Sequence, residues 1–78
     1  MTEAPAAVLD LGPRLLAARA ARFLTGTLER AKWFRRVRVA SEGGELRLVI
    51  EVLAPVEECK PYLPTAVDRV PTVIVRVG

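Results

Sequence analysis

The 78-residue chain contains no histidine and only one cysteine, Cys59. Without histidine, neither a Ser–His or Cys–His nucleophilic pair nor a histidine-rich zinc site can form. A lone cysteine is more often a small buried hydrophobic residue than a reactive thiol. The neighbouring acids Glu57 and Glu58, with Asp68, would make at most a weak site for a hard cation. We therefore predict a non-enzymatic protein with no catalytic residues, no metal site and no cofactor.

Long apolar runs are also missing. Glu51 interrupts the longest apolar stretch, so the sequence predicts no membrane-spanning segment and no membrane partner. No basic region leads into an apolar run at the N-terminus, which argues against a signal peptide. Ten arginines against two lysines, with abundant Ala, Val and Pro, are typical of a GC-rich bacterial coding bias. We expect a cytoplasmic bacterial protein.

Aromatic residues are scarce, at 5% of the chain, although 51% of all residues are hydrophobic. A chain of this length builds only a small core, and here neither a disulfide nor a metal adds stability. Association with other chains is the common remaining source of stability. We therefore predict a homo-oligomer, most simply a dimer, with a different protein as a possible partner.

The most regular pattern is an alternation of apolar and other residues over 46–53, which predicts a strand with one buried face. A second alternating run, 35–41, precedes the pair Gly43-Gly44, and two glycines suit a two-residue hairpin turn. A turn centred on this pair sets Val39 opposite Leu48, Val37 opposite Ile50, and Arg36 opposite Glu51. A shift of one residue would lose both the apolar and the charge match.

Residues 13–34 predict one amphipathic helix, with Gly26 as its weakest point. Its predicted apolar stripe comprises Leu16, Ala20, Phe23, Leu24, Thr27, Leu28, Ala31 and Phe34. A last alternating run predicts a strand over 72–77. The predicted fold is α+β: a flexible arm over 1–12, then a single domain over 13–78. In that domain, one long N-terminal helix packs on a three-stranded, mostly antiparallel sheet with strands 35–41, 45–53 and 72–77.

Two surfaces are candidates for binding. The first is the face of the sheet that points away from the helix, predicted to carry Arg47, Val49, Glu51, Leu53, Ile74 and Arg76. RNA-binding sheets usually present aromatic side chains for base stacking, and this face has none. Aliphatic residues ringed by opposite charges instead favour a protein interface. Our leading functional hypothesis is therefore a small assembly module that self-associates through this face or through the flank of the helix.

The second candidate is a basic and aromatic flank of the helix, extended by two arginines of the first strand. It comprises Arg19, Arg22, Gly26, Arg30, Trp33, Arg36 and Arg38. This flank suits either nucleic-acid phosphates or a second helix that crosses at Gly26. In the simpler alternative, Trp33 folds over the edge of the sheet and the arginines are solvated. Nucleic-acid binding is thus the second hypothesis, and a third is an inhibitor or adaptor that offers a strand edge to a larger protein.

Overall fold

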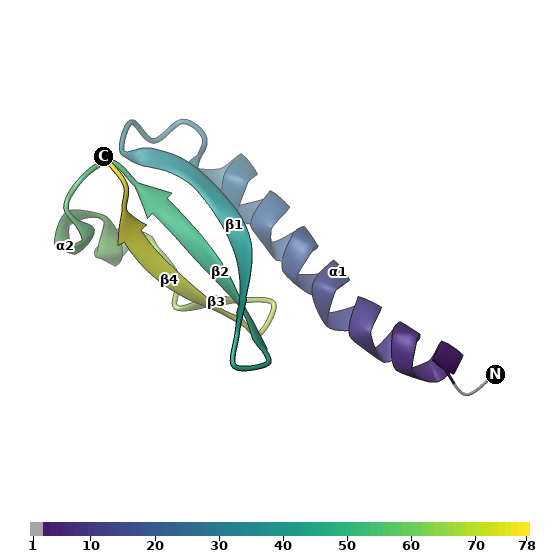
Figure 1. The fold of residues 1–78 in the computed structure, drawn as a ribbon. Helices are drawn as coiled ribbons and strands as arrows, with labels where there is room; N and C mark the ends of the chain where they lie inside the picture. The colour runs from purple at the N-terminus through teal and green to yellow at the C-terminus, as the bar shows by residue number, and fades with distance from the viewer. Residues whose placement is uncertain (1–2) are drawn as a thin grey trace.

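The computed structural model describes the backbone of residues 3–78 and the side chains of residues 12–78. It has an α+β fold in which one long helix, α1 (Glu3–Leu28), packs on a four-stranded sheet (Figure 1). The strands are β1 (Phe34–Glu42), β2 (Glu45–Val52), β3 (Ala66–Val67) and β4 (Val70–Arg76). A short helix α2 (Val56–Cys59) and a 3-10 turn η1 (Lys60–Tyr62) lie between β2 and β3. The predicted α+β class is confirmed.

The hairpin of β1 and β2 has the predicted register. Val39 lies opposite Leu48, Val37 opposite Ile50, and Arg36 opposite Glu51. The turn is Gly43-Gly44, and both glycines have positive φ, 61° and 83°. This conformation matches the twist of the two strands and is unfavourable for residues with a Cβ atom. Sequence reasoning therefore located both the turn and the pairing.

The sheet has four strands in the order β1-β2-β4-β3, so the prediction of three strands was wrong by one. β2 pairs with β4 in parallel, while the two outer pairs are antiparallel, which makes the sheet mixed. A parallel neighbour requires a long crossover connection, and the segment with α2 and η1 supplies it. β3 pairs with β4 through a tight turn at Asp68 and Arg69, which have φ of 50° and 69°.

The helix begins and ends earlier than predicted. α1 starts at Glu3, runs through Pro13 and Gly26 without a break, and ends at Leu28. The segment before Pro13 is rich in alanine and leucine, which favour helix. Pro13 itself has no N–H to donate to the carbonyl one turn earlier in the helix. The flexibility of the arm over 1–12 stays a prediction, and residues 1 and 2 lie outside the described residues. Near the other end, the N–H of Ala31 donates to the carbonyl of Leu28, and the chain turns into β1.

The core lies between α1 and one face of the sheet, which we call the inner face. Its buried members are Ala17, Ala20, Leu24, Leu28, Leu48, Ile50, Val52, Cys59, Leu63 and Val70. The predicted helical stripe was too wide, because Leu16, Phe23 and Thr27 are exposed. The helix instead contributes Ala20, Leu24 and Leu28 of the predicted stripe to the core, together with Ala17, which the prediction left out.

Candidate functional site

No helix packs on the opposite side of the described sheet, which we call the outer face. Of the residues predicted there, Arg47, Val49, Glu51 and Leu53 alternate with the core residues of β2 and point outward. Ile74 and Arg76 do not: they pair with Ile50 and Val52, and Ile74 packs against the core. The residues of this strand that share the outer face are Val73, Val75 and, by continued alternation, Val77.

The error on β4 has a simple cause. Alternation divides a strand into two faces but does not say which face is buried. In a hairpin the turn fixes the register, whereas a parallel strand joined by a crossover carries no such local rule. The larger size of Ile74 compared with the alternate valines was the one available signal for its burial.

Glu51 is held between two arginines on the outer face. Arg36 Nε donates to Glu51 Oε1 at 2.7 Å, and Arg38 Nε donates to Oε2 at 2.9 Å. The pairing with Arg36 was predicted, and the second bond, from the diagonal neighbour Arg38, was not. Only 6% of Glu51 is exposed. The hydrogen bonds from Arg36 and then Arg38 lower the pKa of Glu51 below its ordinary value, against the opposing effect of burial.

This lowered pKa predicts that acid weakens the fold through Glu51. Below about pH 4.3 the unfolded chain binds a proton at this residue before the folded chain does. Its contribution is therefore present above that pH and disappears as the pH falls through the folded pKa. We expect Glu51→Gln to lower the urea midpoint at pH 7 and to approach the wild type in acid. Glu57→Gln, an exposed change on α2, is the control; a deficit for Glu51→Gln that is equally large at pH 3 would contradict the assignment.

The predicted basic flank is divided between two sides of the molecule. Arg19, Arg22 and Gly26 are exposed on α1, and a Cβ atom added at Gly26 would meet no atom within 4 Å. The remaining members lie elsewhere, because α1 ends at Leu28. Arg30 and Trp33 belong to the connection that follows the helix, and Arg36 and Arg38 point to the outer face of the sheet. The seven residues therefore do not form one continuous surface.

Trp33 follows the simpler of the two predictions. It is half-buried against the core, and its ring centroid lies 6.4 Å from that of Tyr62 at an interplanar angle of 33°. The carbonyl of Trp33 also accepts a hydrogen bond from the N–H of Leu53 at 2.7 Å. Both contacts fix the entry of the chain into β1. Trp33 therefore stabilises the fold and does not share a surface with the arginines of α1.

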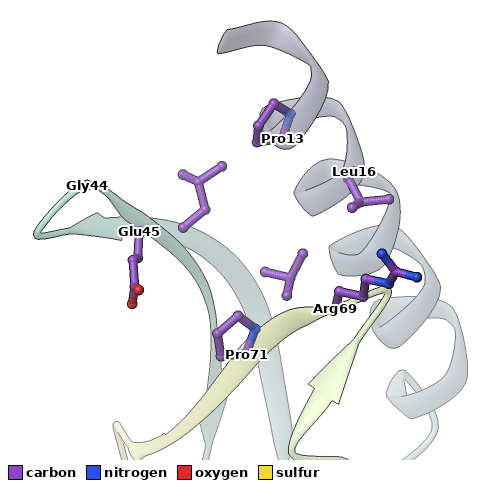
Figure 2. A pocket seen from close by; sticks show the side chains of 8 residues that line it. Pro13, Leu16, Gly44, Glu45, Arg69 and Pro71 are labelled. Atoms are coloured by element: carbon purple, nitrogen blue, oxygen red, sulfur yellow. The ribbon is translucent and has the colours of Figure 1, made fainter. Parts of the chain in front are cut away.

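Sequence reasoning missed a hollow of about 390 Å³ between α1 and the hairpin end of the sheet (Figure 2). Pro13 and Leu16 border it on the helix, Glu45 lies on the side of the hairpin, and Arg69 lies across from it, next to the helix (Figure 2). Gly44, Leu46, Val70 and Pro71 complete its lining. Its walls come from segments far apart in the chain, and no local pattern indicates that they meet. The lining combines several apolar groups with one carboxylate and one guanidinium group on opposite sides.

The remaining candidates for chemistry do not meet in one site. Cys59 is fully buried, and burial, followed by the charge of Glu58, raises the pKa of its thiol. A thiol in this state is a weak nucleophile. Among residues 3–78, no three His, Cys, Asp or Glu side chains form a group that could hold a metal ion.

Two further findings concern membrane spanning and similarity to known proteins. Within the same described residues, no helix is both long and apolar enough to span a bilayer. The chain matches no protein-family model, and no curated protein and no solved structure was found to be similar to it.

Proposed function

We propose that this chain is a non-enzymatic assembly module that binds a second copy of itself through the outer face of its sheet. The observation that carries this proposal is a helix-free sheet face with an aliphatic row beside a set of ion pairs. The row comprises Val49, Val73 and Val75, continued by Leu53 and Val77 just beyond the ends of β2 and β4; Val49 is already buried at 7% exposure, and Val73 and Val75 are half-buried. Leu53 and Val77 are 42% and 48% exposed, so the end of the row is open to a partner. Such a face is typical of sheets that pack against another layer.

The chain is more extended than a typical domain of its length. The chain exposes 5824 Å², whereas a monomeric protein of 8.5 kDa exposes about 4,650 Å². Its radius of gyration is 14.1 Å, compared with about 11.5 Å for a typical domain of this length. The projecting start of α1 contributes to both differences (Figure 1). Part of the excess area therefore belongs to the projecting helix and not to the outer face of the sheet.

Charges at the two ends of the outer face would set the orientation of the second copy. At one end Arg36 and Arg38 surround Glu51, for a net charge of +1. The hairpin end carries the other group, in which Glu42 and Glu45 lie 3.9 and 3.8 Å from Arg47, for a net charge of −1. A two-fold axis across the strands places the basic end of one copy on the acidic end of the other. Like ends would meet in the alternative orientation, so charge favours antiparallel stacking.

Leu53→Arg tests the proposal, because it adds a charge to the exposed end of the aliphatic row. We expect it to weaken self-association at least about tenfold, which corresponds to about 1.4 kcal/mol. The same replacement at Leu15, exposed on α1, serves as the control and leaves association unchanged. Sedimentation velocity over a range of concentrations measures both. A wild-type chain that stays monomeric at high micromolar concentration, or equal effects of the two variants, contradicts the proposal.

Nucleic-acid binding is the second candidate, and the exposure of Arg19, Arg22 and Arg30 favours it. Salt separates the two functions. Contacts with phosphates weaken steeply between about 50 and 200 mM salt, whereas an aliphatic interface changes little. Binding of labelled DNA or RNA that falls steeply with salt, and that is lost on Arg19→Gln and Arg22→Gln, would support this second candidate.

A further inference from the structure

β1 is the longer of the two edges of the sheet, because β3 at the opposite edge has only two residues. It spans nine residues, and six of them are exposed. One side of β1 pairs with β2, and the other has no neighbouring strand in the described chain. An edge of this kind can bind a further strand through its free N–H and carbonyl groups. We propose that it pairs with the β1 edge of a second copy, antiparallel, about a two-fold axis through Val39.

The position of the axis follows from strand geometry and charge. Opposed residues of an antiparallel pair point to the same face, so the axis must pass through a residue. An axis through Arg38 sets the two copies of this arginine against each other, and one through Val37 sets Arg36 against the partner's Arg38. Both arrangements oppose like charges. An axis through Val39 instead sets Arg36 opposite the partner's Glu42, and this pairing occurs twice.

An axis through Ala40 also opposes unlike charges, Arg38 and the partner's Glu42. However, it shortens the overlap to residues 38–42 of each strand, whereas the axis through Val39 overlaps residues 36–42. The longer overlap allows more backbone hydrogen bonds. Charge and length together therefore favour Val39.

The groups that would pair are available. Arg36 bonds to Glu51 through Nε, which leaves its two terminal nitrogens to reach across the edge. Glu42 is exposed, and its nearest described cation, the Arg47 guanidinium, lies 3.9 Å away. Both side chains are on the outer face of the sheet. An ion pair between them would form at the rim of the joined sheets. It would determine the register of the two strands and add little to the affinity.

A second observation at Val39 points to the same axis. Val39 is on the inner face, opposite the fully buried Leu48, yet it is 39% exposed. Val39 is therefore only partly covered, although α1 packs on β1 and Val37 of the same strand lies against the core. About an axis through Val39, the two valines lie directly opposite each other and cover one another. The joined strands would form a continuous sheet of eight strands.

This inference deepens the proposed function by naming a second surface for the same partner, another copy of the chain. The two surfaces share the charges of Arg36 and Glu42 but differ in geometry: the outer face gives stacked sheets, and the β1 edge extends the sheet sideways. Either contact alone yields a dimer, and both together yield a larger assembly. Each can therefore fail without the other.

Glu42→Arg tests the edge, because it places arginine opposite the partner's Arg36. We expect edge association to fall at least about tenfold by sedimentation velocity. Glu57→Arg is the matched control, since it makes the same change in charge at an exposed position of α2, which takes no part in either proposed surface. It leaves edge association unchanged. Equal effects of the two variants, or a monomeric wild type at high micromolar concentration, would overturn the inference.

Cross-linking tests the register. A cysteine at Val39 would lie opposite its own copy with Cα atoms about 4.5–5.5 Å apart, within reach of a disulfide. We expect Val39→Cys to form covalent dimers on mild oxidation, and Ser41→Cys, which opposes the partner's Val37, to form few. Cys59 is buried and does not compete. Equal cross-linking at the two positions would overturn the axis, as would cross-linking that persists in Val39→Cys with Glu42→Arg.

The two surfaces are distinguished by combining variants. Leu53→Arg leaves the Val39→Cys cross-link intact if the edge contact is present, whether or not the outer face binds. Loss of association in Leu53→Arg with loss of the cross-link indicates that the outer face alone holds the copies together, which overturns the edge proposal. Cross-linking and association that depend on Glu42 and not on Leu53 support the edge and contradict the outer face.

Discussion

Leu48→Ala is expected to lower the free energy of unfolding by about 2–5 kcal/mol. Leu48 is fully buried on the inner face of β2, where it packs in the core with residues of α1. β2 itself is flanked by β1 on one side and β4 on the other. Removing three carbon atoms there loses their transfer free energy and leaves a cavity that the strands cannot close without losing register. The total stability of a 78-residue domain is about 4–12 kcal/mol. This single change therefore removes a large share of the stability, and urea unfolding followed by circular dichroism measures the loss.

Leu15→Ala is the matched control, because Leu15 is exposed on α1. Alanine is the better helix former, and we expect a change within about 0.5 kcal/mol. Both proteins should be compared at a concentration at which they have the same association state, because binding a second copy raises apparent stability. Similar losses for the two variants would mean that the inner face of β2 is not the centre of the core.

Replacing either of two glycines by alanine is expected to change stability in opposite directions. Gly44→Ala should cost about 1–2 kcal/mol, because φ at this residue is 83° and a Cβ atom is unfavourable there. Gly26→Ala should gain about 0.5–1 kcal/mol, because Gly26 lies inside α1 and its Cβ atom would point into open space. Neither added methyl group meets a neighbour within 4 Å, so the difference comes from the backbone alone.

Gly43→Asn is a further check on the turn, since asparagine tolerates positive φ and is common at the first position of such hairpins. We expect it to cost less than Gly44→Ala in the same urea measurement. If Gly44→Ala is neutral, the turn does not require positive φ. A loss of stability in Gly26→Ala that grows with protein concentration would instead place Gly26 in a contact between copies.

The sequence alone determined the hairpin of β1 and β2, because its signals are local. Gly43-Gly44 supplies the turn, and two alternating runs at fixed distances from it set every opposed pair, including Arg36 with Glu51. The α+β class and one unbroken helix through Gly26 follow in the same way from periodicity. The self-association that we infer from the small core stays a prediction.

Only the tertiary structure decided the features that depend on distant segments. β4 lies beside β2 in parallel, and this pairing buries Ile74 and turns Val73 and Val75 outward. Phe23 of α1 is 63% exposed, although its spacing matches that of the buried residues of the helix. Periodicity identifies which side chains share a face, but the burial of that face depends on which element packs against it, and local sequence does not encode this.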